Sequence, residues 1–415
     1  MSDALRSVEE HLAAVLEAAP LLGASDVALA AAAGRTLAEP VCARVDIPVF
    51  DNSAMDGFAV RHHDVASASD DAPVILRVVA DLPAGTELDP PLAAGEAARI
   101  MTGSPLPAAA DTVVPFEDTA GGLDDSLESA RVTRAPRSLG AHIRRRGGDA
   151  GIGDTIVAAG ERLGPFQLAA AAASGVATVT AHRRPRVAVV STGSELAAPG
   201  ATLRRGQIPE SNSILLTELA RAADADVVLT ASVDDTDAAF LDILERAREA
   251  GADVIVTSGG VSAGAYEVVK NTLSSGGEVD FVKVAMQPGK PQAFGRLADG
   301  TLFFGLPGNP VSSAVSFEMF VRPALLAMQG RRDIRRPLLR LTAATGWRTP
   351  PGRRQYLPAA IDRADPAGWR VGPATAGGSG SHLAGGLARA EAYAVVPADV
   401  DAVEPGDPVD VMLIT

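Results

Sequence analysis

The segment DNSAMDGFAVR, residues 51–61, places two carboxylates close together directly after an apolar run. Asp51 and Asp56 flank an Asn-Ser pair, and Gly57 follows, so the composition indicates a turn rather than a helix. Carboxylate oxygens are hard donors that could ligate Mg²⁺ or position a water molecule for attack. The alternative is that both side chains cap the turn by accepting backbone N–H groups. From the motif alone we favour the capping interpretation.

A second stretch with chemical potential is RRRGGD, residues 144–149, in which three arginines precede two glycines and Asp149. Guanidinium groups bind phosphate through paired N–H donors, and a neighbouring carboxylate suits a metal ion bound to the same phosphate. A solvated arginine face is the alternative. Most arginine runs are such faces, but the net charge of -14 of the whole chain strengthens the case for a specific role with an anion.

Three other stretches have the composition of ligand loops, namely STGSE at 191–195, SGGVS at 258–262 and GLPGNP at 305–310. Glycine lets backbone N–H groups approach an anion closely, and a helix start adds unpaired donors. Asn309 suits the N-cap and Pro310 the first helical position after the last loop. Each loop could be only a turn, but three together favour a ligand site.

The segment KVAMQPGKP, residues 283–291, presents Lys290 on a loop that two prolines and a glycine stiffen. A lysine in this position is a candidate point charge for a phosphate or another oxyanion. A solvated surface lysine is the alternative interpretation.

These loops need a scaffold, and residues 184–332 have the pattern of one. Apolar strands there alternate with helical stretches at 213–223, 237–250 and 312–328. The alternation predicts βαβ units and a parallel sheet covered on both faces, which is a three-layer α/β domain. Since the carboxyl ends of such strands meet at one edge, we expect the three loops to converge on a crevice.

The remaining sequence predicts three further units, which makes this a multidomain α/β plus β protein. Residues 46–146 contain short β-type runs between Pro, Gly and Asp, as in an irregular β-rich inserted domain. The helical patterns at 1–45 and 147–183 flank it and predict a discontinuous helical linker domain. Residues 333–415 show closely spaced short strands, which predict a small C-terminal β-barrel.

Composition excludes several classes of protein. Lys and Arg total 37 against 51 Asp and Glu, so the chain would repel nucleic acid. The one cysteine, Cys42, can form neither an internal disulfide nor a CxxC zinc site, and we expect a cytoplasmic location. The amino terminus predicts an amphipathic helix rather than a secretion signal, and the alanine-rich stretch 166–181 is too weakly apolar to predict a membrane segment.

The motifs occur in an order that is similar to one known family. DNSAMDGFAVR, RIMTGSPLP, IRRRGGD, STGSEL, SGGVSAGAYEVVK and GLPGNPVS together resemble the molybdopterin molybdenumtransferases, the family of MoeA and the gephyrin E domain. The resemblance implies an elongated homodimer of four-domain subunits, with 184–332 as the molybdopterin-binding domain. It also implies an enzyme that inserts molybdenum from molybdate into adenylylated molybdopterin, with Mg²⁺-dependent hydrolysis of the adenylate and release of AMP and molybdenum cofactor.

The resemblance also implies site residues. The catalytic ones are Asp56, Thr102, Asp149, Glu195 and Asp235. Of these, Asp56, Asp149 and Asp235 would bind Mg²⁺, and Asp235 is preferred to its neighbour Asp234. The substrate-binding residues are Ser191, Thr192, Gly193, Ser258, Gly259, Gly260, Ser262, Glu267, Lys283, Lys290, Pro307, Gly308, Asn309, Pro310, Arg353 and Ser381.

Two positions depart from the family pattern. Gln287 stands where many relatives have lysine, so one positive charge of the anion pocket is missing. Glu267 stands where aspartate is common, and its side chain is one methylene longer.

Two other functions are compatible with parts of the sequence. A molybdopterin adenylyltransferase or a nucleotide-amide hydrolase would resemble only residues 184–332, and the β-rich insert and the terminal barrel argue against both. A non-catalytic scaffold like gephyrin is the third hypothesis. The sequence shows no long linker or appended partner domain in its favour.

Overall fold

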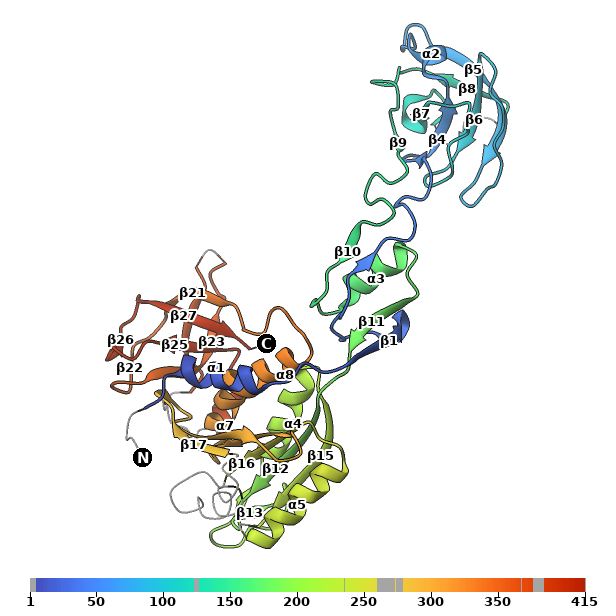
Figure 1. Cartoon of the computed structure of the whole chain (residues 1–415). Helices are drawn as coiled ribbons and strands as arrows, with labels where there is room; N and C mark the ends of the chain where they lie inside the picture. Colours follow the sequence, from blue (N-terminus) through green and yellow to red (C-terminus); the bar gives the residue numbers. More distant parts are fainter. Residues whose placement is uncertain are drawn as a thin grey trace.

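The chain extends along one long axis, with a large α/β unit and a barrel at one end and a β-rich module at the other (Figure 1). The computed structural model describes residues 5–122, 127–234, 236–259, 273, 279–366, 368–375 and 384–414. A narrow connecting part lies between the two ends (Figure 1).

A six-stranded sheet in the order β15-β12-β16-β20-β19-β17 forms the centre of the α/β unit. Its strands are β12 (Arg186–Thr192), β15 (Asp226–Val233), β16 (Val254–Ser258), β17 (Val279–Lys283), β19 (Pro291–Arg296) and β20 (Leu302–Leu306). The first four strands in the sheet order are parallel, as predicted, but β19 runs antiparallel to both of its neighbours, β20 and β17. The predicted parallel direction fails only for β19, because short connections, with no crossover helix, join it to β17 and β20.

Helices cover both faces of this sheet, which confirms the predicted three layers. They are α4 (Asn212–Ala222), α5 (Asp237–Glu249), α7 (Pro310–Ser316) and α8 (Arg322–Met328), with a π-helical turn, η5 (Phe317–Val321), between the last two. Phe240 and Ile243 of α5 pack on one face, and Leu216 of α4 packs on the other. The run Pro310–Met328 is long and apolar enough to cross a membrane, but 83% of its apolar stretch is buried inside the protein.

The first helix, α1 (Val8–Ala18), also belongs to this core. Ser7 caps it, with Glu10 completing a capping box. Its buried residues Val8, Leu12 and Val15 pack in the same cluster as α8 and the central sheet. From the sequence we placed residues 1–45 in the linker domain. In the structure, the apolar residues of α1 pack against the α/β unit instead.

The connecting part contains two strand pairs and one helix. Its elements are β1 (Ala24–Ala28) with β11 (Thr178–His182), β2 (Val41–Cys42) with β10 (Thr155–Val157), η1 (Leu29–Ala31) and α3 (Pro165–Ala173). Pro165 occupies the start of α3, where its missing N–H is harmless. The linker is therefore only partly helical, because α3 packs on short strands rather than on another long helix.

Asp224 joins the connecting part to the α/β unit. Its carboxylate accepts two hydrogen bonds from Arg162, at 2.7 and 2.8 Å, and one from Arg331 at 2.9 Å. Burial alone would raise the pKa of Asp224, but the hydrogen bonds from the two arginines lower it below its ordinary value. The ion cluster therefore stabilises the folded chain while Asp224 is ionised.

We expect Asp224→Asn to lower the free energy of unfolding by about 2 kcal/mol at pH 7, because it leaves two arginines without their anion. Asparagine also tolerates the left-handed backbone of this residue, whose φ is 57°. Since the folded pKa lies below the unfolded one, the difference from wild type should be full above about pH 4 and disappear as the pH falls through the folded pKa. Urea unfolding across this range checks it, and a difference that does not shrink at all as the pH falls below about 4 would contradict the assignment.

The distal module contains a five-stranded sheet in the order β7-β4-β6-β5-β8. Its elements are β3 (Asn52–Ser53), β4 (Gly57–Val60), α2 (His62–Val65), β5 (Val74–Leu82), β6 (Glu96–Ile100), β7 (Thr112–Pro115), η2 (Phe116–Asp118), β8 (Ser129–Val132) and β9 (Ile143–Arg144). Strand β4 lies between β6 and β7, so the peptide after Asp56 is packed on both sides.

Gly57 has no room for a side chain. A Cβ atom there would lie 2.0 Å from the carbonyl oxygen of Val114 and 2.8 Å from Cα of Pro115. We expect Gly57→Ala to destabilise the module by about 2–4 kcal/mol, because β7 would have to move. Thermal unfolding checks this against Gly23→Ala, where a Cβ would meet nothing within 4 Å. Equal midpoints for the two variants would contradict the packing argument.

The C-terminal strands close into the predicted barrel. They are β21 (Leu338–Ala343), β22 (Trp347–Arg348), β23 (Arg354–Asp362), β24 (Arg370–Pro373), β25 (Ala392–Val396), β26 (Ala402–Val403) and β27 (Pro408–Leu413), with a short helix, α9 (Ala384–Leu387). The order β23-β24-β21-β27-β25 returns to β23, which closes the ring. Strand β18 (Met286–Gln287) of the α/β unit adds to β23, so the loop that carries Lys290 is hydrogen-bonded to the barrel.

Candidate functional site

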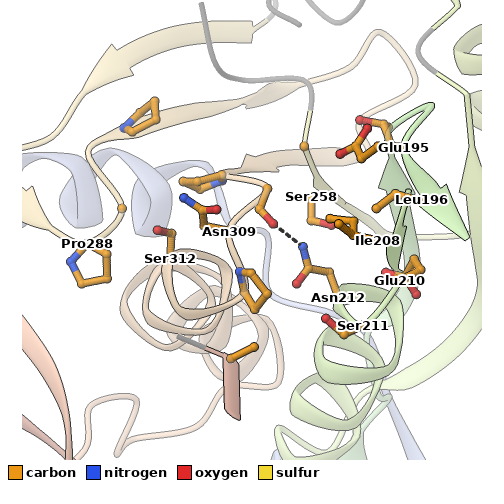
Figure 2. Close-up of a pocket in the computed structure, with 18 of the residues that line it drawn as sticks. Glu195, Leu196, Ile208, Glu210, Ser211, Asn212, Ser258, Pro288, Asn309 and Ser312 are labelled. Atoms are coloured by element: carbon orange, nitrogen blue, oxygen red, sulfur yellow. Dashed lines mark hydrogen bonds between the residues drawn. The ribbon is translucent and has the colours of Figure 1, made fainter. Parts of the chain in front are cut away.

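A cavity of about 850 Å³ opens at the carboxyl ends of β12, β16 and β20. This is the edge at which the sequence predicted three loops to converge. Figure 2 shows Glu195 and Ser258 on one side of the cavity, and Asn309 and Ser312 on the other. The predicted substrate or catalytic residues that line it are Thr192, Glu195, Ser258, Gly259, Lys290, Pro307, Gly308, Asn309 and Pro310.

Two glycines form the floor of the cavity. Gly259 has a φ of 91°, and a Cβ atom on it would lie 2.4 Å from the carbonyl oxygen of Thr192. A Cβ on Gly308 would lie 3.4 Å from Cα of Gly259. The backbones of three strand-end loops therefore meet closely, and their peptide groups form much of the surface that a ligand would contact.

Lys290 is the one lysine or arginine among the described residues that line this cavity, whereas Glu195 and Glu210 contribute acids. Two hydrogen bonds fix the loop of Lys290. The side-chain amide of Gln292 donates to the carbonyl oxygen of Gly289 at 2.6 Å and to Oγ of Ser316 at 2.7 Å. The charge of Lys290 is thus presented on an anchored loop, and the side chain is half-buried.

Arg353 reaches the cavity wall from the barrel. It does not line the cavity itself, but its guanidinium donates to the side-chain oxygen of Gln287 at 2.7 Å, and Gln287 is a lining residue. A neutral glutamine accepts this hydrogen bond, which a lysine at the same position could not do.

Other predicted substrate residues lie beside the cavity. Ser191 is buried at the end of β12, and Gly193 lines a neighbouring cavity of about 430 Å³. Lys283 is exposed at the end of β17 and is not a lining residue. Five predicted positions, Asp235, Gly260, Ser262, Glu267 and Ser381, lie outside the described residues.

Asp56, Thr102 and Asp149 occupy the distal module and its junction with the connecting part, far from the cavity of the same chain (Figure 1). The backbone N–H of Thr102 donates to Oδ1 of Asp56 at 2.6 Å. Hydrogen bonds from the Thr102 backbone and then from its side chain lower the pKa of Asp56. All three residues are exposed. One chain therefore does not bring these acids to the strand-end loops.

Asp51 has a different role from Asp56. It accepts hydrogen bonds from the backbone of Arg146 at 2.7 Å and from the Arg145 side chain at 2.6 Å, and these lower its pKa. Arg146 also pairs with Asp46. Asp51 therefore binds the basic run at 144–149 rather than capping its own turn, and two of the three arginines in that run already have carboxylate partners.

No group of three His, Cys, Asp or Glu side chains that could hold a metal ion occurs within the described ranges. Asp56 uses one carboxylate oxygen for Thr102, and Asp149 is exposed. Both fit a hard cation as partial ligands, and further oxygen donors would have to come from elsewhere.

The sequence did not single out Glu210 and Asn212, which line the cavity at the start of α4. The side-chain amide of Asn212 donates to the carbonyl oxygen of Gly308 at 2.7 Å, shown dashed in Figure 2. This contact joins α4 to the β20 loop. The only local signal was the polar cluster PESN, residues 209–212, directly before a helical pattern.

Comparison with known sequence families covers most of the chain. Residues 6–175 match the MoeA N-terminal region (domain I and II), residues 188–327 a probable molybdopterin binding domain, and residues 340–414 the MoeA C-terminal region (domain IV).

Relatives match along the full length. Molybdopterin molybdenumtransferase 2 of Mycobacterium tuberculosis is 44% identical over 417 residues, which are 99% of this chain and 100% of the relative. The molybdopterin molybdenumtransferase of Synechococcus elongatus is 36% identical, over 97% and 95% of the two chains. The crystal structure of a molybdopterin biosynthesis moeA protein from Pyrococcus horikoshii superposes with a TM-score of 0.82 at 26% identity, covering 99% of this chain and 100% of that one.

Proposed function

The chain belongs to the molybdopterin molybdenumtransferase family, enzymes of molybdenum cofactor biosynthesis, and on that premise we propose that it transfers molybdenum from molybdate to adenylylated molybdopterin and releases AMP. The cavity at the carboxyl ends of β12, β16 and β20 is the observation that carries this proposal. Its volume of about 850 Å³ falls within the ordinary range for a ligand of this size.

The lining suits a nucleotide-like anion. The close approach of Gly259 and Gly308 exposes backbone rather than side chains, and Pro310 begins a helix at the rim. Lys290 supplies one anchored positive charge. In the proposal Lys290 holds an oxyanion, while the glycine floor accommodates the flat part of the ligand.

The site is completed, we propose, by a second copy of the chain. Asp56, Thr102 and Asp149 lie on a module that projects away from the α/β unit (Figure 1). In a homodimer the module of one subunit can cover the cavity of the other, which brings these acids to the ligand. This arrangement reconciles the separation of the predicted residues within one chain with a single reaction site.

Magnesium is part of the proposal because carboxylates alone would repel a bisphosphate. Asp56 and Asp149 would hold the ion together with oxygens of the substrate. When bound, the ion supplies charge neutralisation on the phosphates and an acidified water molecule. The chain itself orients Asp56 through Thr102 and keeps it ionised, since the hydrogen bonds lower its pKa.

The alternative functions are not favoured. A relative 44% identical over 99% of this chain extends the match well beyond the α/β unit that an adenylyltransferase or nucleotide-amide hydrolase would share. Metal-dependent release of AMP would separate the enzyme from a scaffold, which would release none. We also propose a cytoplasmic location, in keeping with the single free cysteine, Cys42.

The test is an assay of purified protein with adenylylated molybdopterin, Mg²⁺ and molybdate. We expect AMP and a cofactor that activates a molybdenum-free acceptor enzyme. If no AMP is released, the proposed function is wrong. A parallel reaction with molybdopterin and ATP but no molybdate distinguishes the alternative, because an adenylyltransferase would make the adenylate instead of consuming it.

A further inference from the structure

Glu210 is a buried carboxylate at the wall between two cavities. Its side chain borders both the cavity of about 850 Å³ and the neighbouring one of about 430 Å³, yet only 6% of the residue is exposed. Buried carboxylates are rare in proteins unless they are fully hydrogen-bonded. The contacts of Glu210 therefore indicate what it does.

Glu210 joins the end of β12 to the start of α4. One carboxylate oxygen accepts from Oγ of Ser191 at 2.8 Å and from the backbone N–H of Ser213 at 2.8 Å. The other oxygen accepts from Oγ of Ser213. Both oxygens are thus bound by protein donors, so the carboxylate acts through the protein rather than as a group for the ligand.

The carboxylate also sets the direction of the next hydrogen bond. Ser191 and Ser258 lie 3.2 Å apart, and geometry alone allows either hydroxyl to be the donor. Because a carboxylate only accepts, Ser191 must give its proton to Glu210, and Ser258 must therefore donate to Ser191. The chain Ser258, Ser191, Glu210 fixes the end of β16 to the end of β12 in one orientation.

We propose that Glu210 is a positioning residue for this reaction, which holds the ends of β12 and β16 and the start of α4 at the spacing that keeps the ligand cavity formed. This inference rests on the proposed function only in taking the cavity as the substrate site. The residues it positions, Thr192 and Gly259, directly follow Ser191 and Ser258 in the chain and line that cavity.

Substitutions at this position have distinct expected effects. Glu210→Ala leaves the N–H of Ser213 and the hydroxyl of Ser191 without an acceptor. Glu210→Gln can keep one oxygen for both of these donors and turn its amide toward Oγ of Ser213, which can accept. Glu210→Asp is one methylene shorter and cannot span Ser191 and Ser213 together.

The first experiment uses the full chain without ligand and measures backbone hydrogen exchange at residues 191–196 and 258–259. We expect exchange to be at least about tenfold faster in Glu210→Ala and in Glu210→Asp, and near wild type in Glu210→Gln. Glu318→Ala is the matched control, because Glu318 is 5% exposed and ion-paired with Arg336 but does not line the cavity. The control should leave these two segments unchanged.

Three results would overturn the proposal: wild-type exchange in Glu210→Asp, equal acceleration in Glu210→Gln, or the same acceleration in Glu318→Ala. If Glu210→Ala does not fold, the aspartate and glutamine variants still decide the question.

The second experiment measures the binding of AMP with Mg²⁺. We expect its dissociation constant to rise about tenfold in Glu210→Asp and to be restored in Glu210→Gln. If the wild-type protein does not bind AMP, that result contradicts the proposed function. The hydrogen-exchange experiment then still decides whether Glu210 has the positioning role. If wild type binds AMP and Glu210→Asp binds it equally well, the positioning role is wrong while the proposed function stands.

Discussion

Replacing Asp56 by asparagine is expected to reduce the rate of AMP release by at least about a hundredfold while the protein still folds. Asp56 is exposed, and its hydrogen-bond donors are the backbone and the side chain of Thr102, which an asparagine oxygen can also accept. The fold should therefore tolerate the change. The lost negative charge removes a ligand for the cation and an acceptor for the proton of water.

The measurement is single-turnover release of AMP, together with thermal unfolding and size-exclusion chromatography. Asp81→Asn is a suitable control, because Asp81 is an exposed aspartate of the same module that lies near Arg99, at 3.9 Å, and outside the proposed site. The control should release AMP at the wild-type rate. An undiminished rate in Asp56→Asn would remove Asp56 from the mechanism.

Replacing Lys290 by methionine is expected to weaken binding of the anionic substrate by about ten- to a hundredfold, an effect that should appear mainly in KM. Lys290 is the one basic side chain among the described lining residues, and two lining carboxylates stand in the same cavity. Methionine keeps the apolar stem and most of the volume. The loop should remain in place, because Gln292 and Ser316 hold it from below.

Lys290→Arg separates charge from shape, since it keeps the positive charge and should bind within a few-fold of wild type. Raising the salt concentration should weaken binding to wild type more than to Lys290→Met. A methionine variant with wild-type KM and wild-type salt dependence would show that the oxyanion does not bind at Lys290.

The sequence predicted the scaffold of the site well where the determining interactions are local. Glycines, prolines and the N-cap position mark the strand-end loops, and apolar spacing marks α4 and α5. Because the carboxyl ends of parallel strands meet at one edge of a sheet, the convergence of the three loops could be predicted from these elements. The reversed direction of β19 could not be predicted in this way, because its apolar residues look like those of a buried parallel strand. The apolar stripe of α1 likewise predicts a buried helix face, but it does not indicate which domain packs against that face.

The site itself was predicted in part. Glu210 was missed because its partners, Ser191 and Ser213, belong to elements whose contact with it depends on the folded sheet. The roles of Asp51 and Asp56 were ambiguous in sequence, and the structure separates them by giving Asp51 two arginine partners. Asp56 and Asp149 came from resemblance, and the sequence of one chain contains no information about which copy they serve.

The most direct test of the shared site is to co-express Asp56→Asn and Lys290→Met subunits with different tags, purify the mixed dimer, and measure AMP release at a substrate concentration well below the wild-type KM, where both parent variants are slow. If each site takes Asp56 from one subunit and Lys290 from the other, one of the two sites in the mixed dimer is intact, and AMP release should recover to about half the wild-type rate. If both residues act within one subunit, both sites carry a defect. A mixed dimer as inactive as the two parent variants would contradict the account.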